Sequence, residues 1–231
     1  MSYLIVAAHP DDEVLGAGGL IYCLSHQGEI VDVCILSAKA EARAHRPTDE
    51  ELDSDMRKSM NLLGARNIYE GEFPNIKLNT VPHIELVQFI EKAILDSGAD
   101  HIITHHPSDL NHDHYQTSLA CQEAARLFQR RNDVKPLQSL LFMEVPSSTE
   151  WAFNTSIRQF TPDTFVEIGK EGLEKKLSAL SCYRGVMREY PHPRSYEAIQ
   201  GLAAYRGSQA GSYYAEAFET AFRRIGENKN V

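Results

Sequence analysis

Short apolar runs alternate with helically periodic segments along the first two thirds of the chain. A run such as residues 3–8 (YLIVAA) is almost uniformly apolar, which is typical of a strand covered on both faces of a parallel sheet. The segments between such runs repeat apolar residues at helical spacing, and two of them stop at Gly28 and Gly64, a residue type that favours helix ends. The pattern predicts strands over residues 3–8, 30–36, 101–104 and 139–144, and helices over residues 17–27, 50–63, 84–95 and 115–129.

The pattern changes after residue 145. One further strand is predicted over 164–168, followed by helices over 169–183, 195–205 and 214–222. No linker, internal repeat or low-complexity tract interrupts the chain, so we expect residues 1–231 to form a single domain. Alternating strands and helices predict an α/β fold, a Rossmann-like three-layer αβα sandwich with a mostly parallel sheet and a C-terminal helical cap.

Composition and charge limit the partners. The chain is 42% hydrophobic and 24% charged, and its 23 Lys and Arg against 32 Asp and Glu give a net charge of −9. This balance, with no long basic run, argues against nucleic acid or an anionic membrane surface and favours a small molecule. No run approaches the ~20 apolar residues of a membrane helix and the first residues lack a signal-peptide layout, so we expect a cytoplasmic protein. The four cysteines contain no C-x-x-C pair, which fits neither a disulfide framework nor a thiolate zinc site.

The first polar cluster, His9-Pro10-Asp11-Asp12-Glu13, directly follows the first predicted strand. Ligands of open α/β sheets bind at the carboxyl ends of strands, so the cluster lies where a site is expected. Imidazole and carboxylate donors suit Zn²⁺, and catalytic zinc takes three protein ligands and keeps one open position. Adjacent carboxylates allow one to bind a metal while the other accepts a proton from water.

The second polar cluster, residues 104–114 (THHPSDLNHDH), follows the strand over 101–104 and runs into a helix. A histidine near that helix start would meet the first cluster across the sheet and supply a third ligand. Asp109 or Asn111 would equally serve as the helix cap. One such cluster alone is more often a hydrogen-bonded turn, but two clusters at two strand ends favour a metal site.

These residues resemble a known family. The hexapeptide Ala8–Glu13, the glycines of Gly16-x-Gly18-Gly19 and the pair Asp113-His114 are similar to the PIG-L/LmbE-like family of zinc-dependent N-deacetylases, and the likeness spans nearly the whole chain. Residues 145–151, 190–195 and 205–208 resemble a bacterial branch associated with sugar and glycoconjugate metabolism.

The resemblance implies a site and a reaction. It implies that His9, Asp12 and His114 hold Zn²⁺, that Asp11 is the general base, and that Glu13 orders the loop. Fe²⁺ is the other candidate ion, because affinity for first-row metals depends on availability as well as on ligands. The implied reaction removes the N-acetyl group of a GlcNAc-type amino sugar, free or linked to a nucleotide or carrier, and gives acetate and an amine. It also implies a homo-oligomer, with a hexamer favoured.

One position departs from the family pattern. Many members carry a histidine three residues before the third ligand, where this chain has Asn111, and an amide cannot protonate a leaving amine. We therefore expect the proton donor to be His192, which lies between two prolines, or else His112, with Asp113 orienting an imidazole. The expected substrate contacts are Arg43 (with Arg46 competing for the role), Asn111 and Arg194. Arg206 fits either a contact to substrate or a neighbouring subunit, or a helix C-terminal turn capped by Gly207.

Two other functions fit parts of the sequence. The same ligands would serve a metal-dependent amidase for another N-acyl compound, such as a thiol conjugate. The cluster Gly16-Ala17-Gly18-Gly19 also fits a non-catalytic Rossmann-type binding module. In that fold, however, the glycines follow the strand directly, whereas here three acidic residues that repel phosphate precede them.

Overall fold

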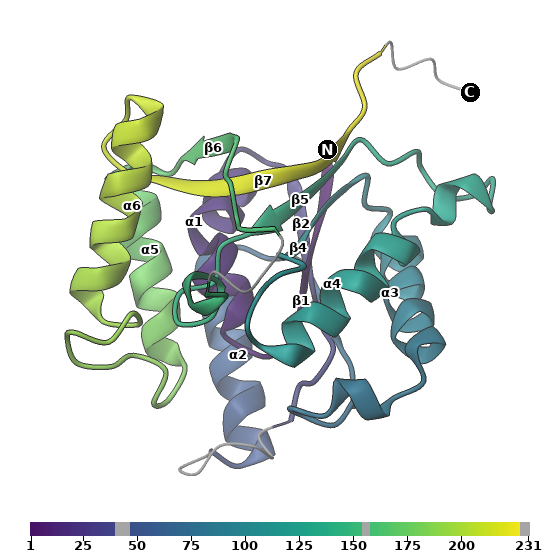
Figure 1. The fold of residues 1–231 in the computed structure, drawn as a ribbon, viewed down its shortest axis with the longest axis horizontal. Coiled ribbons are helices and arrows are strands. Elements are labelled where there is room, and N and C mark those ends of the chain that lie inside the picture. Colours follow the sequence, from purple (N-terminus) through teal and green to yellow (C-terminus); the bar gives the residue numbers. More distant parts are fainter. Residues whose placement is uncertain (40–46, 154–157, 227–231) are drawn as a thin grey trace.

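The structure is a computed structural model that describes residues 1–39, 47–153 and 158–226. It contains a seven-stranded sheet. Figure 1 shows helices on both faces of this sheet. The strands are β1 (Ser2–Ala7), β2 (Ile30–Ile35), β3 (Ile68–Glu70), β4 (His101–His105), β5 (Ser139–Met143), β6 (Thr164–Glu167) and β7 (Ala215–Arg223). The helices are α1 (Asp12–His26), α2 (Asp49–Leu63), α3 (His83–Ser97), α4 (His112–Ala124), α5 (Gly169–Cys182) and α6 (Tyr196–Ala210).

The order of the strands reverses direction at β1. The strands run β3-β2-β1-β4-β5-β7-β6, and β1 to β5 are parallel, while β7 is antiparallel to both of its neighbours. The chain moves outward from β1 through β2 to β3 and then returns to β4 on the other side of β1. Ligands of open α/β sheets bind at such a reversal, outside the carboxyl ends of the strands. The predicted α/β class and mostly parallel sheet are confirmed.

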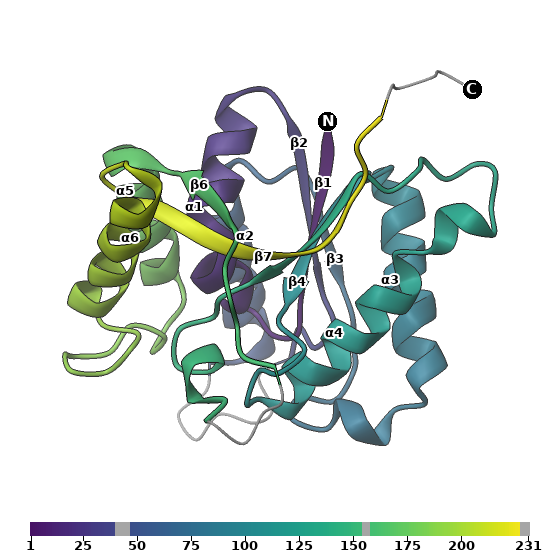
Figure 2. The ribbon, with the colours of Figure 1, turned by 45° about the horizontal axis from the view of Figure 1, so that its top comes forward.

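Two apolar layers sandwich the sheet. Along β1, Ile5 and Ala7 belong to one core with residues of α1, α2, α5 and α6, while Leu4 and Val6 belong to a second core with residues of α3 and α4. Figure 2 shows α3 and α4 on the opposite side of the sheet from α1, α5 and α6. Because both faces of the central strands are covered, their sequences are apolar throughout. This arrangement confirms the three-layer prediction, with α5 and α6 as the C-terminal helices.

The helix predicted over 214–222 is wrong, because this segment is strand β7, which pairs with β5 and β6. Glu216 and Glu219 lie three residues apart, as on the polar face of a helix. Both carboxylates are in fact buried, and they pair with Lys176 and Arg158. The sequence analysis also missed the three-residue edge strand β3.

Helix α6 extends beyond the predicted end, to Ala210, and its left-handed C-cap is Gly211 rather than Gly207. Arg206 therefore lies inside the helix, and its guanidinium binds the carboxylate of Glu144 through Nη2–Oε1 (2.6 Å) and Nε–Oε2 (3.0 Å). The partner of the Arg206 side chain is therefore Glu144 of the same chain. Within the described ranges, no helix has both the length and the apolar character needed to cross a bilayer.

Candidate metal and active site

The turn between β1 and α1 places the first polar cluster where the strand order reverses. The His9 N–H donates to Asp12 Oδ2 (3.0 Å), and Asp12 begins α1. Glu13 orders this turn as expected: Oε2 accepts the Asp11 N–H (3.0 Å) and Oε1 accepts the Tyr183 hydroxyl (2.5 Å). Burial raises the pKa of Glu13 to about 8. The turn is therefore fixed by a carboxyl group that faces inward.

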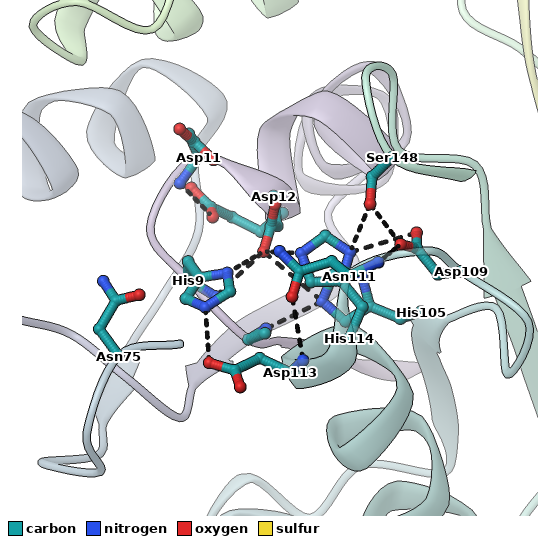
Figure 3. A network of polar contacts seen from close by, with 12 residues as sticks. His9, Asp11, Asp12, Asn75, His105, Asp109, Asn111, Asp113, His114 and Ser148 are labelled. Carbon is teal, nitrogen blue, oxygen red and sulfur yellow. Dashed lines mark hydrogen bonds and ion pairs between the residues drawn. The ribbon is translucent and has the colours of Figure 1, made fainter. Parts of the chain in front are cut away.

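Helix α4 brings His114 to the same place. Asn111 caps α4, since its side-chain oxygen accepts the Asp113 N–H (2.9 Å), and His114 lies in the first turn. The Asp12 Oδ2 atom is 3.2 Å from His9 Nδ1 and 3.1 Å from His114 Nε2. Figure 3 shows these three side chains converging. All are buried, and their ligand atoms lie within 4.8 Å of one another, which suits a metal ion. The structure thus brings together the three residues predicted as ligands.

Each of these imidazoles also contacts a second carboxylate. His9 Nε2 lies 3.0 Å from Asp113 Oδ2, and His114 Nδ1 lies 3.2 Å from Asp109 Oδ2. Such pairs fix the orientation of metal-binding histidines in proteins. Asp113 was expected to orient an imidazole, and here its partner is His9. Asp109 was expected at most to cap a helix, but its carboxylate is a hub that also accepts hydrogen bonds from the residues Asn111 (N–H), Ser148 (hydroxyl) and Thr149 (hydroxyl).

The charges of the cluster favour a cation at its centre. Burial lowers the pKa of His114, but the carboxylates of Asp12 and Asp109 outweigh burial and raise it to about 10. Burial likewise opposes ionisation of Asp12, yet His114 and His9 hold its pKa well below the usual range. The surrounding carboxylates therefore favour positive charge at this place. A metal ion would supply that charge, with both histidine ligands neutral.

His105, at the end of β4, is a site residue that the sequence analysis missed. Its ring stacks on His114, with centroids 3.9 Å apart and planes at 22°. Its Nε2 accepts the Ala8 N–H (2.9 Å), and burial lowers its pKa to about 3. His105 is therefore neutral and fixes both the end of β1 and the plane of His114. The sequence contained a signal for this residue in the adjacent pair His105-His106. Because successive strand residues face opposite sides of the sheet, one histidine of such a pair is expected on the side of the cluster.

An open pocket adjoins the cluster. Three of the four non-glycine residues with positive φ among the described residues line it: Asp11 (101°), Ile76 (58°) and Ser147 (75°). Such backbone conformations are unfavourable and concentrate at functional sites. The complete lining comprises His9, Asp11, Asp12, Leu15, Asn75, Ile76, Asn111, His114, Val145, Ser147, Ser148 and Arg194.

The other predicted site residues divide into two groups. Asn111 and Arg194 line the pocket, and Arg194 Nη1 lies 3.7 Å from Asp11 Oδ2. His192 does not line it, but its Nδ1 accepts the Arg194 N–H (3.0 Å). His112 is exposed and contacts Gln116 on α4. Arg43 and its competitor Arg46 lie outside the described residues.

The glycine cluster does not form a phosphate-binding turn. Gly16, Gly18 and Gly19 lie within α1, and none has a positive φ. A Cβ added at Gly16 would lie 2.5 Å from Met143 Sδ, and one at Gly19 would lie 2.7 Å from Ile168 Cγ2. The glycines therefore allow close packing, which removes the basis for a Rossmann-type binding module.

Comparison with known proteins agrees with this site. The model of the PIG-L family (GlcNAc-PI de-N-acetylase) matches residues 4–125, slightly more than half of the chain, so the protein belongs to the PIG-L family. Membership supports a hydrolytic N-deacetylase of amino sugars in general. Among curated proteins, none matches the chain significantly.

Solved structures share the fold. The conserved protein TT1542 from Thermus thermophilus has a TM-score of 0.79 at 22% identity, with 100% of both chains covered. The N,N'-diacetylchitobiose deacetylase from Pyrococcus horikoshii has a TM-score of 0.71 at 20% identity, covering 94% of this chain and 82% of that chain. GalB, the 4-carboxy-2-hydroxymuconate hydratase from Pseudomonas putida, has a TM-score of 0.75 at 24% identity, with 99% of both chains covered. A deacetylase and a hydratase share this fold, so the reaction must be argued from the site.

Proposed function

We propose that the protein is a metal-dependent N-deacetylase that hydrolyses the N-acetyl group of a GlcNAc-type amino sugar, giving acetate and a free amine. The observation that carries this proposal is the convergence of His9, Asp12 and His114 from two strand ends, beside a pocket that Asp11 also lines. Family membership supports the same reaction class.

The donor set fits a catalytic divalent cation. Two imidazoles and one carboxylate are a common ligand set of catalytic zinc. The proposed ion is Zn²⁺, and Fe²⁺ is the other candidate because first-row metals share these donors. When bound, such an ion polarises the amide carbonyl and lowers the pKa of a water molecule. In this proposal Asp109 and Asp113 keep the two imidazoles in the orientation needed to bind it.

The proposed proton acceptor is Asp11. It lines the pocket next to the ligand Asp12, and the contact between Glu13 and its backbone N–H holds it in a left-handed conformation. Asp11 takes the proton of the attacking water. Asn111 uses its side-chain oxygen to cap α4, and its NH₂ group is the proposed donor to the substrate oxygen.

The proposed proton donor to the leaving amine is His192, which is joined to the pocket residue Arg194 by a hydrogen bond. The guanidinium of Arg194 is the proposed contact for the sugar or for its attached group, since a fork of N–H donors suits hydroxyl and phosphate oxygens. Arg43 remains a proposed contact. A homo-oligomer, with a hexamer favoured, is likewise proposed, and light scattering of the purified protein tests it.

Acetate release tests the function. Metal-free protein is loaded with Zn²⁺ or Fe²⁺ and incubated with free, nucleotide-linked and carrier-linked GlcNAc, and with N-acyl thiol conjugates. We expect acetate from an N-acetylated sugar. Acyl release from the thiol conjugates alone would instead favour the amidase alternative, and a purified protein that binds no divalent metal would contradict both.

Asp11→Asn separates chemistry from metal binding. The variant should bind metal at the wild-type stoichiometry and lose a factor of about 10²–10⁴ in turnover, the usual contribution of a general base. Asp133→Asn, the same change at an exposed site paired with Arg131, is the matched control and should keep full turnover. Full turnover in Asp11→Asn would remove Asp11 from the proposed mechanism.

A further inference from the structure

Helix α1 is broken one turn after it begins. Ala17 has non-helical angles (φ −144°, ψ 16°), so α1 consists of a short first turn followed by a longer segment. The first turn carries Asp12 and the pocket residue Leu15. A break of this kind leaves the last carbonyls of one segment and the first amides of the next without helical partners.

A buried ion pair from two other elements satisfies both sides of the break. Lys176 of α5 donates from Nζ to the Leu15 carbonyl (2.8 Å) and to Glu216 Oε1 (2.6 Å). Glu216 of β7 accepts the N–H groups of Gly19 (2.9 Å) and Leu20 (2.7 Å), as an N-cap carboxylate would. The two charged residues are only 6% and 5% exposed.

The glycine cluster makes room for this arrangement. A Cβ added at Gly18 would lie 2.8 Å from Val14 Cγ1 and 3.1 Å from Lys176 Cγ. Side chains at Gly16 and Gly19 would collide with neighbouring residues of β5 and of the turn before α5. The cluster, which the proposed reaction leaves without a role, thus allows the broken helix and the Lys176 stem to pack closely.

A buried ion pair is a weak source of stability, because desolvation opposes its Coulomb attraction. Here each charged group also binds the backbone on one side of the break, so the pair fixes the two segments relative to each other. Leu15 is three residues from Asp12, in the same helical turn. Any shift of the Leu15 carbonyl is therefore transmitted to the carboxylate that faces His9 and His114.

We propose that Lys176 and Glu216 are positioning residues that fix the first turn of α1, and thereby the place of Asp12 between His9 and His114. The proposal rests on the proposed function only in taking Asp12 as a metal ligand. Neither residue lines the pocket beside Asp11. Their expected effect is on metal affinity and turnover, with little effect on substrate affinity.

The test uses the double variant Lys176→Met/Glu216→Gln, which removes both charges and retains a polar group at the α1 amides. Arg206→Met is the matched control, because the pair Arg206–Glu144 lines the same small cavity as Lys176 and Glu216, but the Arg206 side chain donates to Glu144 and Gln209 rather than to α1. The full chain is used, and Zn²⁺ affinity is measured by competition with a chelator, well below the unfolding temperature. Hydrogen exchange of the Gly19 and Leu20 amides reports on the break.

We expect the double variant to bind Zn²⁺ at least about tenfold more weakly and to exchange both amides faster, whereas Arg206→Met keeps wild-type values. If Lys176→Met alone does not fold, the double variant still decides the matter. Wild-type Zn²⁺ affinity in the folded double variant would overturn this inference and leave the deacetylase proposal intact. Weaker Zn²⁺ binding in the double variant, together with no acetate release from any sugar by the wild-type protein, would support the inference and contradict the deacetylase. A wild-type protein that binds no Zn²⁺ would overturn both.

Discussion

The carboxylates around the pocket and the other buried carboxylates of the chain have different partners. Asp12, Asp109 and Asp113, all within residues 4–125, face histidines, which can exchange a proton for a metal ion. Elsewhere a buried carboxylate can face an arginine or a lysine instead, as Asp32 faces Arg66 within the matched part and Glu216 faces Lys176 in the remainder. Glu219 faces both Arg158 and His106. Pairing with histidines suits metal binding, whereas pairing with arginine or lysine suits support of the fold.

The family-matched part and the remainder contribute different residues to the pocket. The proposed ligands and the proposed base come from the turn after β1, from α1 and from α4, whereas Ser147, Ser148 and Arg194 line the pocket from beyond residue 125. Loops around a shared chemical centre can vary without altering that centre. The comparison therefore teaches that the matched part should determine whether the reaction occurs, and the remainder should determine which substrate is bound and how its amine leaves.

The largest expected effect is in the matched part. His114→Ala removes a proposed ligand and should weaken metal binding by more than about 100-fold, since loss of a residue that only orients a ligand already costs about 10–100-fold. His112→Ala, two residues earlier and exposed, is the matched control and should keep the wild-type metal content. Metal analysis after dialysis measures both. Equal metal content in the two variants would show that the ion is bound elsewhere.

The sequence predicted the matched part well for a physical reason. Parallel strands such as β1 and β4 are covered on both faces and so are apolar throughout, and the carboxyl ends of adjacent parallel strands lie at one sheet edge. That rule brought the two polar clusters together, and the resemblance to the PIG-L/LmbE-like family then selected His9, Asp12 and His114 within them. The rule did not reveal His105 or the hub at Asp109, because the side on which a strand-end or loop residue faces depends on the pleat and on partners distant in sequence.

Strand β7, in the remainder, was harder to predict because its acidic residues are buried. Glu216 and Glu219 have the spacing of an exposed helix face, but within the strand they pair with the distant cations Lys176 and Arg158. The proline-flanked His192 was expected at the pocket. The structure places Arg194 there and His192 one hydrogen bond behind it.

The next largest effect tests whether the remainder also takes part in proton transfer. If His192 protonates the leaving amine, His192→Ala should lower kcat by about 10²-fold, the lower end for general acid catalysis, with unchanged metal content. His26→Ala, at the last turn of α1, is the control. Wild-type kcat in His192→Ala would instead assign protonation of the leaving amine to Asp11, because in this mechanism Asp11 holds the proton taken from the attacking water.

The smallest expected effect concerns substrate affinity alone. Arg194 lines the pocket, where its guanidinium lies 3.7 Å from Asp11 Oδ2, and its Nε is buried without a hydrogen-bond partner. The Arg194 side chain is 25% exposed, so its guanidinium can also donate to a substrate oxygen. A hydrogen bond from a charged donor contributes about 1.5–3 kcal/mol, so Arg194→Ala should raise KM by roughly 10- to 100-fold. Metal content should not change, and steady-state kinetics on the best substrate of the panel measures KM.

Arg131→Ala, at an exposed site paired with Asp133, is the control. A fall in metal content in Arg194→Ala would show that the remainder supports the metal site here as well, and the proposed division between the two parts would then fail at this residue.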